Sequence, residues 1–290
     1  MMETKGDSPG DNAEKLVDFI QARAPLMVLT GAGCSTASGI PEYRDDEGEW
    51  KHRKPVQFQD FCRDQLTRQR YWARSLLGWP RLVQAQANDA HLALARLEQA
   101  GFVRQLVTQN VDGLHQKAGS KNVIDLHGQL ESVTCLSCET SYPRSQVQNA
   151  LRRANPAFRE KPVGTAPDGD ALLENFDFSS FELYDCPTCS GILKPDVVFF
   201  GESVPRQRVE AAMRSLDDSR GLLVIGSSLM VYSGYRFCKA AIDKGKHLCA
   251  LNRGRTRADT ELDLKIEDDC VEILNLSIAL LGLELEAKQA

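Results

Sequence analysis

The stretch LMVLTGAGCSTASGIPEYR, residues 26–44, decides the fold. Its apolar run LMVLT is followed at once by a glycine-rich turn, which is how a dinucleotide-binding strand–loop–helix unit usually begins. Gly31 and Gly33 open the GxGxxG pattern, but Thr36 stands where its last glycine belongs, and the next glycine is Gly39. By itself GAG also fits an ordinary strand-to-helix turn, so its meaning depends on the rest of the chain.

Six short apolar runs rich in β-branched residues, each ended by turn or polar residues, predict buried strands. They are residues 26–30, 104–108, 122–126, 221–226, 247–251 and 262–266. Helical patterns occupy residues 90–100, with Asn88 and Asp89 as caps, and residues 205–216, 233–243 and 271–283. Alternating strands and helices predict an α/β fold, with a parallel sheet covered on both faces.

Two regions interrupt this alternation and are interpreted as insertions into a Rossmann-like nucleotide-binding domain. The large domain is then discontinuous and consists of residues 13–45, 88–134 and 196–286. Residues 46–87 are polar, aromatic and Arg-rich, and we expect a helical module that includes part of the cofactor loop. Residues 135–195 form the expected zinc-binding module, and residues 1–12 are expected to be disordered.

The composition of the chain limits the classes of function that it can have. The chain has 290 residues, 42% of them hydrophobic and 26% charged, with a formal net charge of −5, and these values are ordinary for a globular protein. The acidic balance argues against direct nucleic-acid binding. The first residues, MMETKGDSPGDNAEKL, lack the apolar core of a secretory signal and the Arg content of a transit peptide. No stretch approaches the roughly 20 apolar residues of a membrane span. We expect no membrane association, a cytoplasmic location if the source is bacterial, and a monomer.

The clearest chemical signal is a pair of CxxC motifs, Cys135-x-x-Cys138 and, 47 residues later, Cys186-x-x-Cys189. Each motif can place two thiolates on one ion, and together they complete a tetrahedral set. Four sulfurs leave no open coordination position, so the site is expected to hold structural zinc. The alternative is four buried thiols that pair only in sequence. Cys34, in the glycine loop, is interpreted as structural.

Polar or glycine-bearing loops follow five of the predicted strands. In an open parallel sheet, ligands bind beyond the carboxyl ends of the strands, so these loops together predict a nucleotide site. Besides GAG they are residues 109–115, 127–128, 226–229 and 252–254.

The motifs GAGCSTASGIPEYR, TQNVDGLHQKAG, DLHG, the two CxxC pairs, LKPDVVFFGE, GSSL and LNRG, in this order, resemble the sirtuin family from about residue 15 to residue 285. RQRYWARSLLGWP and VYSGYRF resemble its class II subgroup, which includes the mitochondrial sirtuin four of animals and its bacterial relatives. The resemblance implies an NAD-consuming protein-lysine deacylase, with acyl-lysine proteins or peptides as partners. It also implies a Rossmann-like large domain and a smaller domain made of a zinc module and a helical module.

The resemblance implies that the segment after GAG is a mobile loop that closes over the nicotinamide ribose. Ser35 then meets the phosphates with the GAG backbone, and Arg44 adds a charge-assisted contact to phosphate. Ile40 and Asp112 line the nicotinamide pocket. Tyr43, where many sirtuins carry Phe, shields the reactive ribose carbon. The full implied cofactor set is Gly31, Ala32, Gly33, Ser35, Ile40, Tyr43, Arg44, Gln109, Asn110, Asp112, Gly226, Ser227, Ser228, Asn252, Gly254 and Cys270. Of these, Ser227, Asn252 and the backbone near Cys270 are expected to hold the adenosine half. Ser227 and Ser228 fit a helix cap equally well.

His127, between a predicted strand and Gly128, matches the family's general base. An imidazole is suited to this task because its pKa lies near the operating pH, although a lone histidine is often structural. In the implied chemistry the acyl-lysine oxygen attacks the anomeric carbon of NAD and nicotinamide leaves. His127 then helps a ribose hydroxyl attack the imidate, and water releases lysine and acylated ADP-ribose. Asn110 is the second catalytic candidate, because it orients the ribose or a water.

The resemblance places the acyl-lysine tunnel beside VVFFGE, residues 197–202, whose backbone would pair with an extended peptide. Val197, Phe199, Phe200 and Gly201 form one wall and Val231 the opposite side, although VVFF also fits a core strand.

Tyr71 and Arg74, three residues apart on one helix face, form a YxxR pair. Such a pair binds the distal carboxylate in sirtuins that remove succinyl and malonyl groups. The alternative is that Arg74 is an exposed arginine beside aromatic residues of the core. Acidic, branched, lipoyl and acetyl groups therefore all remain possible acyl substrates.

Two other function classes compete with deacylation. Mono-ADP-ribosyl transfer would use the same NAD site, with a protein nucleophile capturing the activated ribose. A non-catalytic NAD-binding sensor would not need His127, Asn110 and Asp112, which are all present. A dehydrogenase is disfavoured, because the loop lacks GxGxxG.

Overall fold

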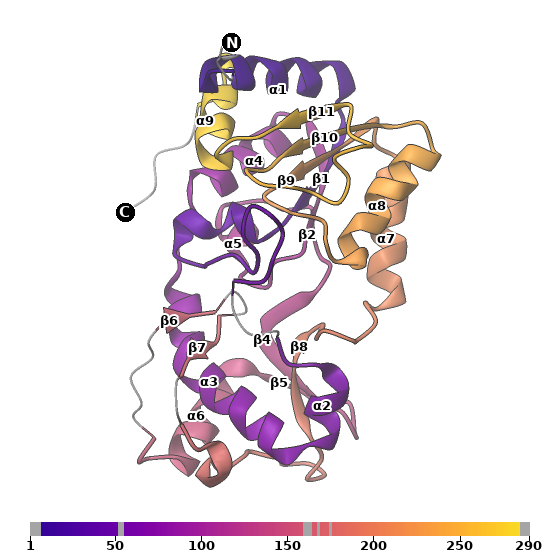
Figure 1. The fold of residues 1–290 in the computed structure, drawn as a ribbon. Coiled ribbons are helices and arrows are strands. Elements are labelled where there is room, and N and C mark those ends of the chain that lie inside the picture. The colour runs from indigo at the N-terminus through magenta and orange to yellow at the C-terminus, as the bar shows by residue number, and fades with distance from the viewer. Residues whose placement is uncertain (1–6, 52–54, 159–163, 167–168, 174–175, 285–290) are drawn as a thin grey trace.

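The structure, a computed structural model, describes residues 7–51, 55–158, 164–166, 169–173 and 176–284. Within them the larger part of the molecule is built on a six-stranded parallel sheet in the order β11-β10-β9-β1-β2-β3 (Figure 1). Each predicted strand is present, which confirms the α/β prediction. The strands are β1 (Leu26–Thr30), β2 (Val103–Thr108), β3 (Val123–Asp125), β9 (Gly221–Ile225), β10 (His247–Leu251) and β11 (Leu264–Ile266).

Helices cover both faces of this sheet. On one face pack α1 (Pro9–Arg23), α4 (Asp89–Gln99) and α9 (Cys270–Leu280), and on the other α7 (Arg206–Asp217) and α8 (Tyr232–Asp243) (Figure 1). The central strand β1 is buried along its whole length. Leu26 and Val28 belong to the first core, whereas Met27 and Leu29 belong to the second. Alternation across a strand therefore explains why LMVLT is apolar at four successive positions.

The helix α1 corrects the prediction of a disordered N-terminus. It begins at Pro9, so the prediction is wrong for residues 9–12, while residues 1–6 lie outside the described residues. Ser8 and Asp11 form a capping box around a proline at the first helical position, which fixes the start of the helix. Asn12 is buried and donates to Asp268, 3.1 Å away, which anchors this first turn on the sheet domain.

The inserted segments form the smaller part of the molecule, below the sheet in Figure 1. The predicted helical second half of residues 46–87 is α3 (Gln65–Gln84), preceded by α2 (Phe58–Arg63). An antiparallel sheet in the order β5-β4-β8 adjoins them. Its elements and the remaining ones are β4 (Gly128–Cys135), β5 (Ser141–Pro143), α6 (Arg144–Ala154), β6 (Gly164–Thr165), β7 (Ala171–Leu172), the 3-10 helix η3 (Phe178–Ser180) and β8 (Leu193–Val197).

The small sheet begins earlier in the chain than the expected zinc module. Gly128 pairs with Val197 and Cys135 with Leu193, so β4 and β8 run together from the sheet domain to the cysteines. The pairing therefore places the boundary near Gly128 and not after residue 134, and the division into domains stays an interpretation. None of the helices in the described parts of the chain is long and apolar enough to cross a membrane.

Candidate active site

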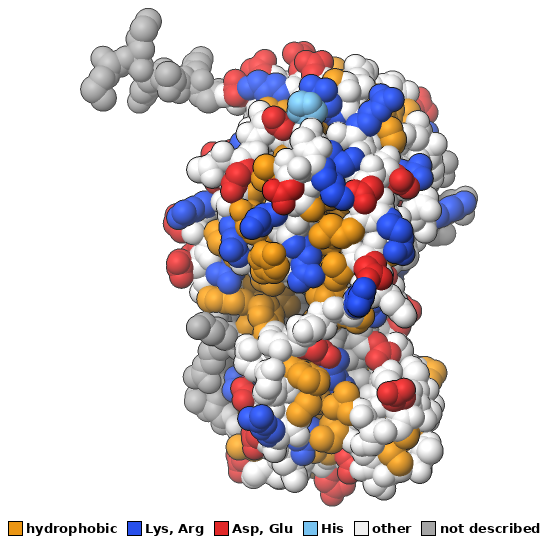
Figure 2. All heavy atoms as spheres, turned by 90° about the vertical axis from the view of Figure 1, so that its right-hand side faces the viewer, with side chains coloured by type: hydrophobic (Ala, Val, Ile, Leu, Met, Phe, Trp, Pro, Cys, Tyr) orange, Lys and Arg blue, Asp and Glu red, His pale blue; other side chains and the backbone are white. Residues whose placement is uncertain are grey.

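A cavity of about 590 Å³ lies at the carboxyl ends of β1, β2, β9 and β10, between the sheet domain and the inserted modules. Figure 2 shows hydrophobic side chains gathered at the waist of this face, between the upper and lower parts of the molecule. The position is the one at which open parallel sheets bind ligands. The cavity is large enough for a nucleotide and part of a second substrate.

The glycine loop is shaped by close contact between two loops. A Cβ on Gly33 would lie 2.9 Å from Gly226 Cα, and one on Gly226, whose φ is +59°, would lie 2.4 Å from Cys34 N. Glycine is therefore required at both positions for the loops after β1 and β9 to meet. The chain then makes two 3-10 turns, η1 (Ala32–Cys34) and η2 (Thr36–Ser38), before Gly39 ends them with φ +82°. The segment between Gly33 and Gly39 is thus a loop that runs along the cavity.

With one exception, the structure places every predicted catalytic, cofactor and substrate residue in the lining of this cavity. The exception is Arg74, and the lining residues are Gly31, Ala32, Gly33, Ser35, Ile40, Tyr43, Arg44, Tyr71, Gln109, Asn110, Asp112, His127, Val197, Phe199, Phe200, Gly201, Gly226, Ser227, Ser228, Val231, Asn252, Gly254 and Cys270.

Ser35, Asn110 and Asp112 form a hydrogen-bonded group on the cavity wall. Ser35 Oγ donates to Asp112 Oδ2 at 2.8 Å and accepts from Asn110 Nδ2 at 3.0 Å. Asn110 also donates to the carbonyl of Gly31, 3.0 Å away, so it ties the end of β2 to the glycine loop. Burial raises the pKa of the Asp112 carboxyl, which opposes the hydrogen bonds that it accepts from Leu114 N and Ser35.

His127 is held in one tautomer by its two neighbours. Its Nδ1 lies 2.9 Å from the carbonyl oxygen of Gln109, which can only accept, so Nδ1 carries the proton. Its Nε2 is then a lone pair, and it accepts from Ser233 Oγ at 2.8 Å. Burial lowers the pKa of His127 to about 4, assisted by the positive charges of Arg208 and Arg236. At neutral pH this side chain is an uncharged base that lines the cavity, with its Nε2 lone pair engaged by Ser233.

Tyr43 and Arg44 lie in a group of aromatic side chains that extends from the glycine loop to Phe200, which belongs to the wall expected to bind the substrate. Tyr43 packs edge-on against Trp50 and Phe200, with ring centroids 6.2 and 6.1 Å apart. The Arg44 guanidinium lies 4.0 Å from the centroid of Trp50 and donates to the carbonyl of Gly48. Arg44 therefore faces the cavity from a preformed position, stacked on an aromatic ring.

The predicted acyl-reading pair is separated by the structure. Tyr71 lines the cavity and packs on Phe199, with ring centroids 5.1 Å apart. Arg74 is absent from the lining, and its Nε donates to the carbonyl of Ala171, 2.9 Å away. The physical reason is the hairpin of β6 and β7, which packs on α3 so closely that a Cβ on Gly78 would lie 2.0 Å from Gly169 O. This contact gives Arg74 a backbone acceptor away from the cavity.

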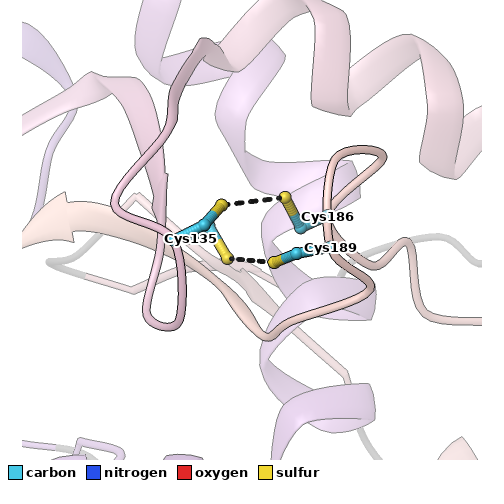
Figure 3. A group of neighbouring side chains, drawn as sticks. Cys135, Cys186 and Cys189 are labelled. Atoms are coloured by element: carbon cyan, nitrogen blue, oxygen red, sulfur yellow. Dashed lines mark hydrogen bonds between the residues drawn. The ribbon is translucent and has the colours of Figure 1, made fainter.

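The four cysteines converge as predicted. Figure 3 shows Cys135, Cys186 and Cys189 with their sulfurs turned toward a common centre. Cys135 Sγ lies 3.5 Å from Cys189 Sγ, and Cys138 Sγ lies 3.6 Å from Cys186 Sγ. A tetrahedral zinc ion with bonds of about 2.3 Å would hold its sulfurs about 3.8 Å apart, so the residues fit this ion. Two tight turns supply the ligands, one after β4 and one before β8.

Two residues of the site could not be predicted from the sequence motifs. Ser233 belongs to VYSGYRF, which marks a subgroup but names no role, and only the fold brings α8 to His127. Trp50 precedes a stretch without periodicity, and its place between Tyr43 and Phe200 follows from the pairing of Arg44 with Trp50. No sequence signal available in one chain would have assigned either residue to the site.

A parallel sheet, a glycine loop, a buried neutral histidine and an attached four-cysteine module define a nucleotide-binding α/β protein with a structural metal module. The Sir2 family matches residues 31–233. The chain therefore belongs to the Sir2 family.

Similar proteins extend this match over almost the whole chain. A protein of Bordetella bronchiseptica named NAD-dependent protein deacetylase is 54% identical over 268 residues, which cover 92% of this chain and 98% of the relative. NAD-dependent protein deacetylase 2 of Bradyrhizobium diazoefficiens is 55% identical over 257 residues, covering 89% and 94%. A solved structure described as Sir2–p53 peptide–NAD+ superposes with a TM-score of 0.76 at 29% identity and covers 97% of this chain and 99% of its own.

Proposed function

We propose that this chain is an NAD-dependent protein-lysine deacylase. The observation that carries the proposal is His127, which lines the cavity as an imidazole whose Nδ1 proton is held by the Gln109 carbonyl, so that its lone pair lies on Nε2. Relatives at more than 50% identity are named NAD-dependent protein deacetylases, which supports the same activity here. NAD, when bound, supplies an activated ribose carbon that can accept an acyl oxygen and release nicotinamide.

The residues of the cavity fit this co-substrate. Asp112 offers a carboxylate for the nicotinamide amide, with Ile40 beside it in the lining. Gln109 Nε2 already bonds Ser227 Oγ at 2.8 Å, so the loops after β2 and β9 are joined where the ribose of the adenosine half would lie. Arg44 supplies a fixed positive charge for phosphate. The roles of these residues are proposals, drawn from their placement.

In the reaction His127 acts as a general base on a ribose hydroxyl. A neutral imidazole with its lone pair on Nε2 is the form that accepts a proton, once the ribose hydroxyl takes the place of Ser233 at Nε2, and its protonated form is stabilised by the Gln109 carbonyl at Nδ1. Asn110, fixed by Gly31 and Ser35, orients the ribose or a water. The aromatic group of Tyr43, Trp50 and Phe200 excludes water from the reacting carbon.

The peptide substrate would lie along residues 197–201, which begin at the last residue of β8 and line the cavity together with Val231. Apolar side chains, among them Ile40, Leu82 and Leu130, also line the cavity and pack in one cluster. We therefore propose an uncharged acyl chain, because Arg74 does not line the cavity and its Nε is bonded to Ala171. The zinc ion of the cysteine module has a structural role, since four sulfurs leave no open position.

The proposal is tested with NAD and a panel of acyl-lysine peptides bearing acetyl, long-chain, lipoyl, succinyl and glutaryl groups. We expect deacylation of uncharged acyl peptides, loss of turnover in His127→Ala with NAD binding retained, and no change of acyl preference in Arg74→Met. Turnover restricted to acidic acyl groups and abolished by Arg74→Met would overturn the acyl assignment. NAD binding without turnover on any peptide would overturn the deacylase assignment.

Mono-ADP-ribosyl transfer is the second candidate, because the same base and cofactor site would serve a protein nucleophile. Its distinguishing product is ADP-ribose attached to protein with no acylated ADP-ribose in solution. We also propose a class II subgroup membership, a monomer without nucleic-acid partners and a cytoplasmic location, the last supported by the bacterial relatives.

A further inference from the structure

A second cluster of metal-ligating side chains lies behind the glycine loop. Cys34 Sγ and one ring nitrogen each from His91 and His115 lie within 4.8 Å of one another. All three side chains are buried, with exposed fractions of 0%, 0% and 1%. They come from three elements, since Cys34 lies in η1, His91 in α4 and His115 in α5 (Leu114–Lys117).

His115 has a ring nitrogen that lacks a hydrogen-bond partner among the described residues. Thr30 Oγ1 donates to Thr108 Oγ1 at 2.9 Å, so it accepts from His115 Nε2, also 2.9 Å away. The proton of this neutral ring therefore sits on Nε2, and Nδ1 is a lone pair. Nδ1 is buried without a partner. A buried lone pair with no donor is destabilising, and it is the form in which an imidazole binds a metal.

The other members complete a site for a borderline-soft cation. The ring of His91 packs against that of His115, with centroids 4.8 Å apart. Asn88 holds His91 Nδ1, 2.9 Å from its Oδ1, so Nε2 is the nitrogen that would bind the ion, in place of its 3.4 Å contact with Ser35 Oγ. Burial lowers the pKa of both histidines, so both are neutral at pH 7, as metal ligands must be. A zinc ion with bonds of about 2.3 Å to sulfur and 2.0–2.1 Å to nitrogen would bring the three atoms to about 3.4–3.6 Å. Side-chain rotations that move each ligand atom by about 1 Å would bring the three atoms to these distances.

Charge at the cluster also favours a divalent cation. A bare ion would be costly to bury, but Cys34 becomes a thiolate when it binds. Burial, and also the nearby Asp112 carboxylate, raise the pKa of the free Cys34 thiol, so the thiolate forms only against a bound cation, which also offsets the charge of Asp112. One thiolate and one carboxylate balance a charge of two. Coordination breaks the S–H bond and forms a sulfur–metal bond, and the proton leaves to solvent.

We propose that Cys34, His91 and His115 form a second metal site, for zinc or a similar divalent cation, that regulates the cofactor loop. The link to the cavity is direct, because Ser35 follows Cys34 and bonds both Asn110 and Asp112. An ion that draws Cys34 toward the two histidines pulls this hydrogen-bonded group away from the cavity. Access is through the loop itself, which is two short 3-10 turns and not a helix.

The consequence for NAD is reciprocal, and this part of the inference rests on the proposed function. If the ion weakens NAD binding, NAD weakens ion binding by the same factor. The four-cysteine site is not involved, since its ligands lie in the inserted module.

The test adds cobalt to full-length protein that already carries one zinc per chain. Cobalt bound to a thiolate gives a charge-transfer band, and the released zinc is counted to exclude exchange at the four cysteines. We expect one cobalt per chain with this band in the wild type. In Cys34→Ala and in Cys34→Val, which restores the volume without sulfur, we expect cobalt affinity to fall by more than the 10–100-fold typical of losing an outer-shell partner. Cys249→Ala is the matched control, because Cys249 is equally buried but lies in β10.

Absence of the band in the wild type, or an equal band in Cys34→Ala, would overturn the site whatever the enzyme's activity proves to be. The coupling is read separately, as the NAD dissociation constant with and without one equivalent of cobalt. We expect weaker NAD binding in the wild type and no effect in Cys34→Val. An unchanged constant in the wild type would overturn the regulatory role.

Discussion

Replacing Ser233 by alanine isolates the hydrogen bond that holds His127 in its neutral form. Ser233 Oγ donates to Nε2 at 2.8 Å while the imidazole is neutral, and it has to rotate and accept from Nε2–H once His127 is protonated. We expect this rearrangement to disfavour protonation, so that the hydrogen bond keeps the pKa of His127 low, in the same direction as burial. Removing it favours protonation of His127.

The size of the effect follows from the value of one hydrogen bond. A net contribution of about 1 kcal/mol corresponds to about 0.7 of a pKa unit. The pKa of His127 is about 4 in the structure, so Ser233→Ala is expected to move it upward by that amount. At pH 7 His127 stays neutral in both proteins, so the two differ little in rate there. The difference appears below about pH 5.5, where the variant loses activity first.

The assay is the pH dependence of kcat/KM for peptide deacylation, because this parameter reports the ionisation of the free enzyme and deacylation includes the step that His127 assists. Tyr235→Phe is the control, since it removes a hydroxyl from the same helix that bonds Glu261 and not His127. An acid limb that stays in place in Ser233→Ala would refute the reasoning. So would a hundredfold loss of rate at pH 7.5, because Ser233 would then relay the proton and not merely position the base.

Three further predictions concern the zinc module, pH and the backbone beside His127. Cys189→Ser should lose the one zinc ion per chain, measured by atomic emission, together with cooperative melting of the β4–β8 module, and a retained ion would contradict the four-cysteine site. Burial lowers the pKa of His127 from 6.5 to about 4, so the unfolded chain binds a proton that the folded chain does not. The contribution of His127 to the free energy of unfolding should be fully present above pH 6.5 and fall by up to about 3 kcal/mol toward pH 4, in addition to the contributions of His91 and His115, whose pKa values burial also lowers. Urea titrations at several pH values should show that the free energy of unfolding falls less toward pH 4 in His127→Gln than in the wild type. An equal pH dependence in both proteins would contradict this linkage. Gly128 has φ +84°, and a Cβ there would lie 1.9 Å from Asp196 O, so Gly128→Ala should destabilise by more than the 1–2 kcal/mol of left-handed strain alone. Gly245→Ala, with φ +63° and open space around it, should show only that strain, and equal losses would contradict the predicted clash.

The strands could be predicted because a strand buried on both faces consists of consecutive apolar residues. LMVLT is apolar at both faces, and β1 packs against helices on both. The prediction extends too far at 122–126 and 262–266, where β3 and β11 keep only three residues. These are the edge strands of the sheet, so each pairs on one side only. The loops that follow the strands were also found, since they are short and the chain order fixes their common edge.

What escaped prediction depends on contacts between distant segments. The start of α1 at Pro9 depends on a local capping box, which was available in the sequence but was outweighed by the polar composition. The turn of Arg74 toward Ala171 needs a hairpin 97 residues away. The bond of Ser233 to His127 spans 106 residues. Helix spacing alone tells which residues share a face, and not which neighbour each one meets.

The stoichiometry of the products tests the central claim most directly. One acetyl-lysine peptide, NAD and the protein are incubated, and nicotinamide, deacetylated peptide and acetylated ADP-ribose are quantified together by mass spectrometry. The account predicts that the three products appear in equal amounts in the wild type and that deacetylated peptide and acetylated ADP-ribose vanish in His127→Ala, in which the Nε2 base is absent. Nicotinamide released without deacetylated peptide, with ADP-ribose attached to protein, would contradict it.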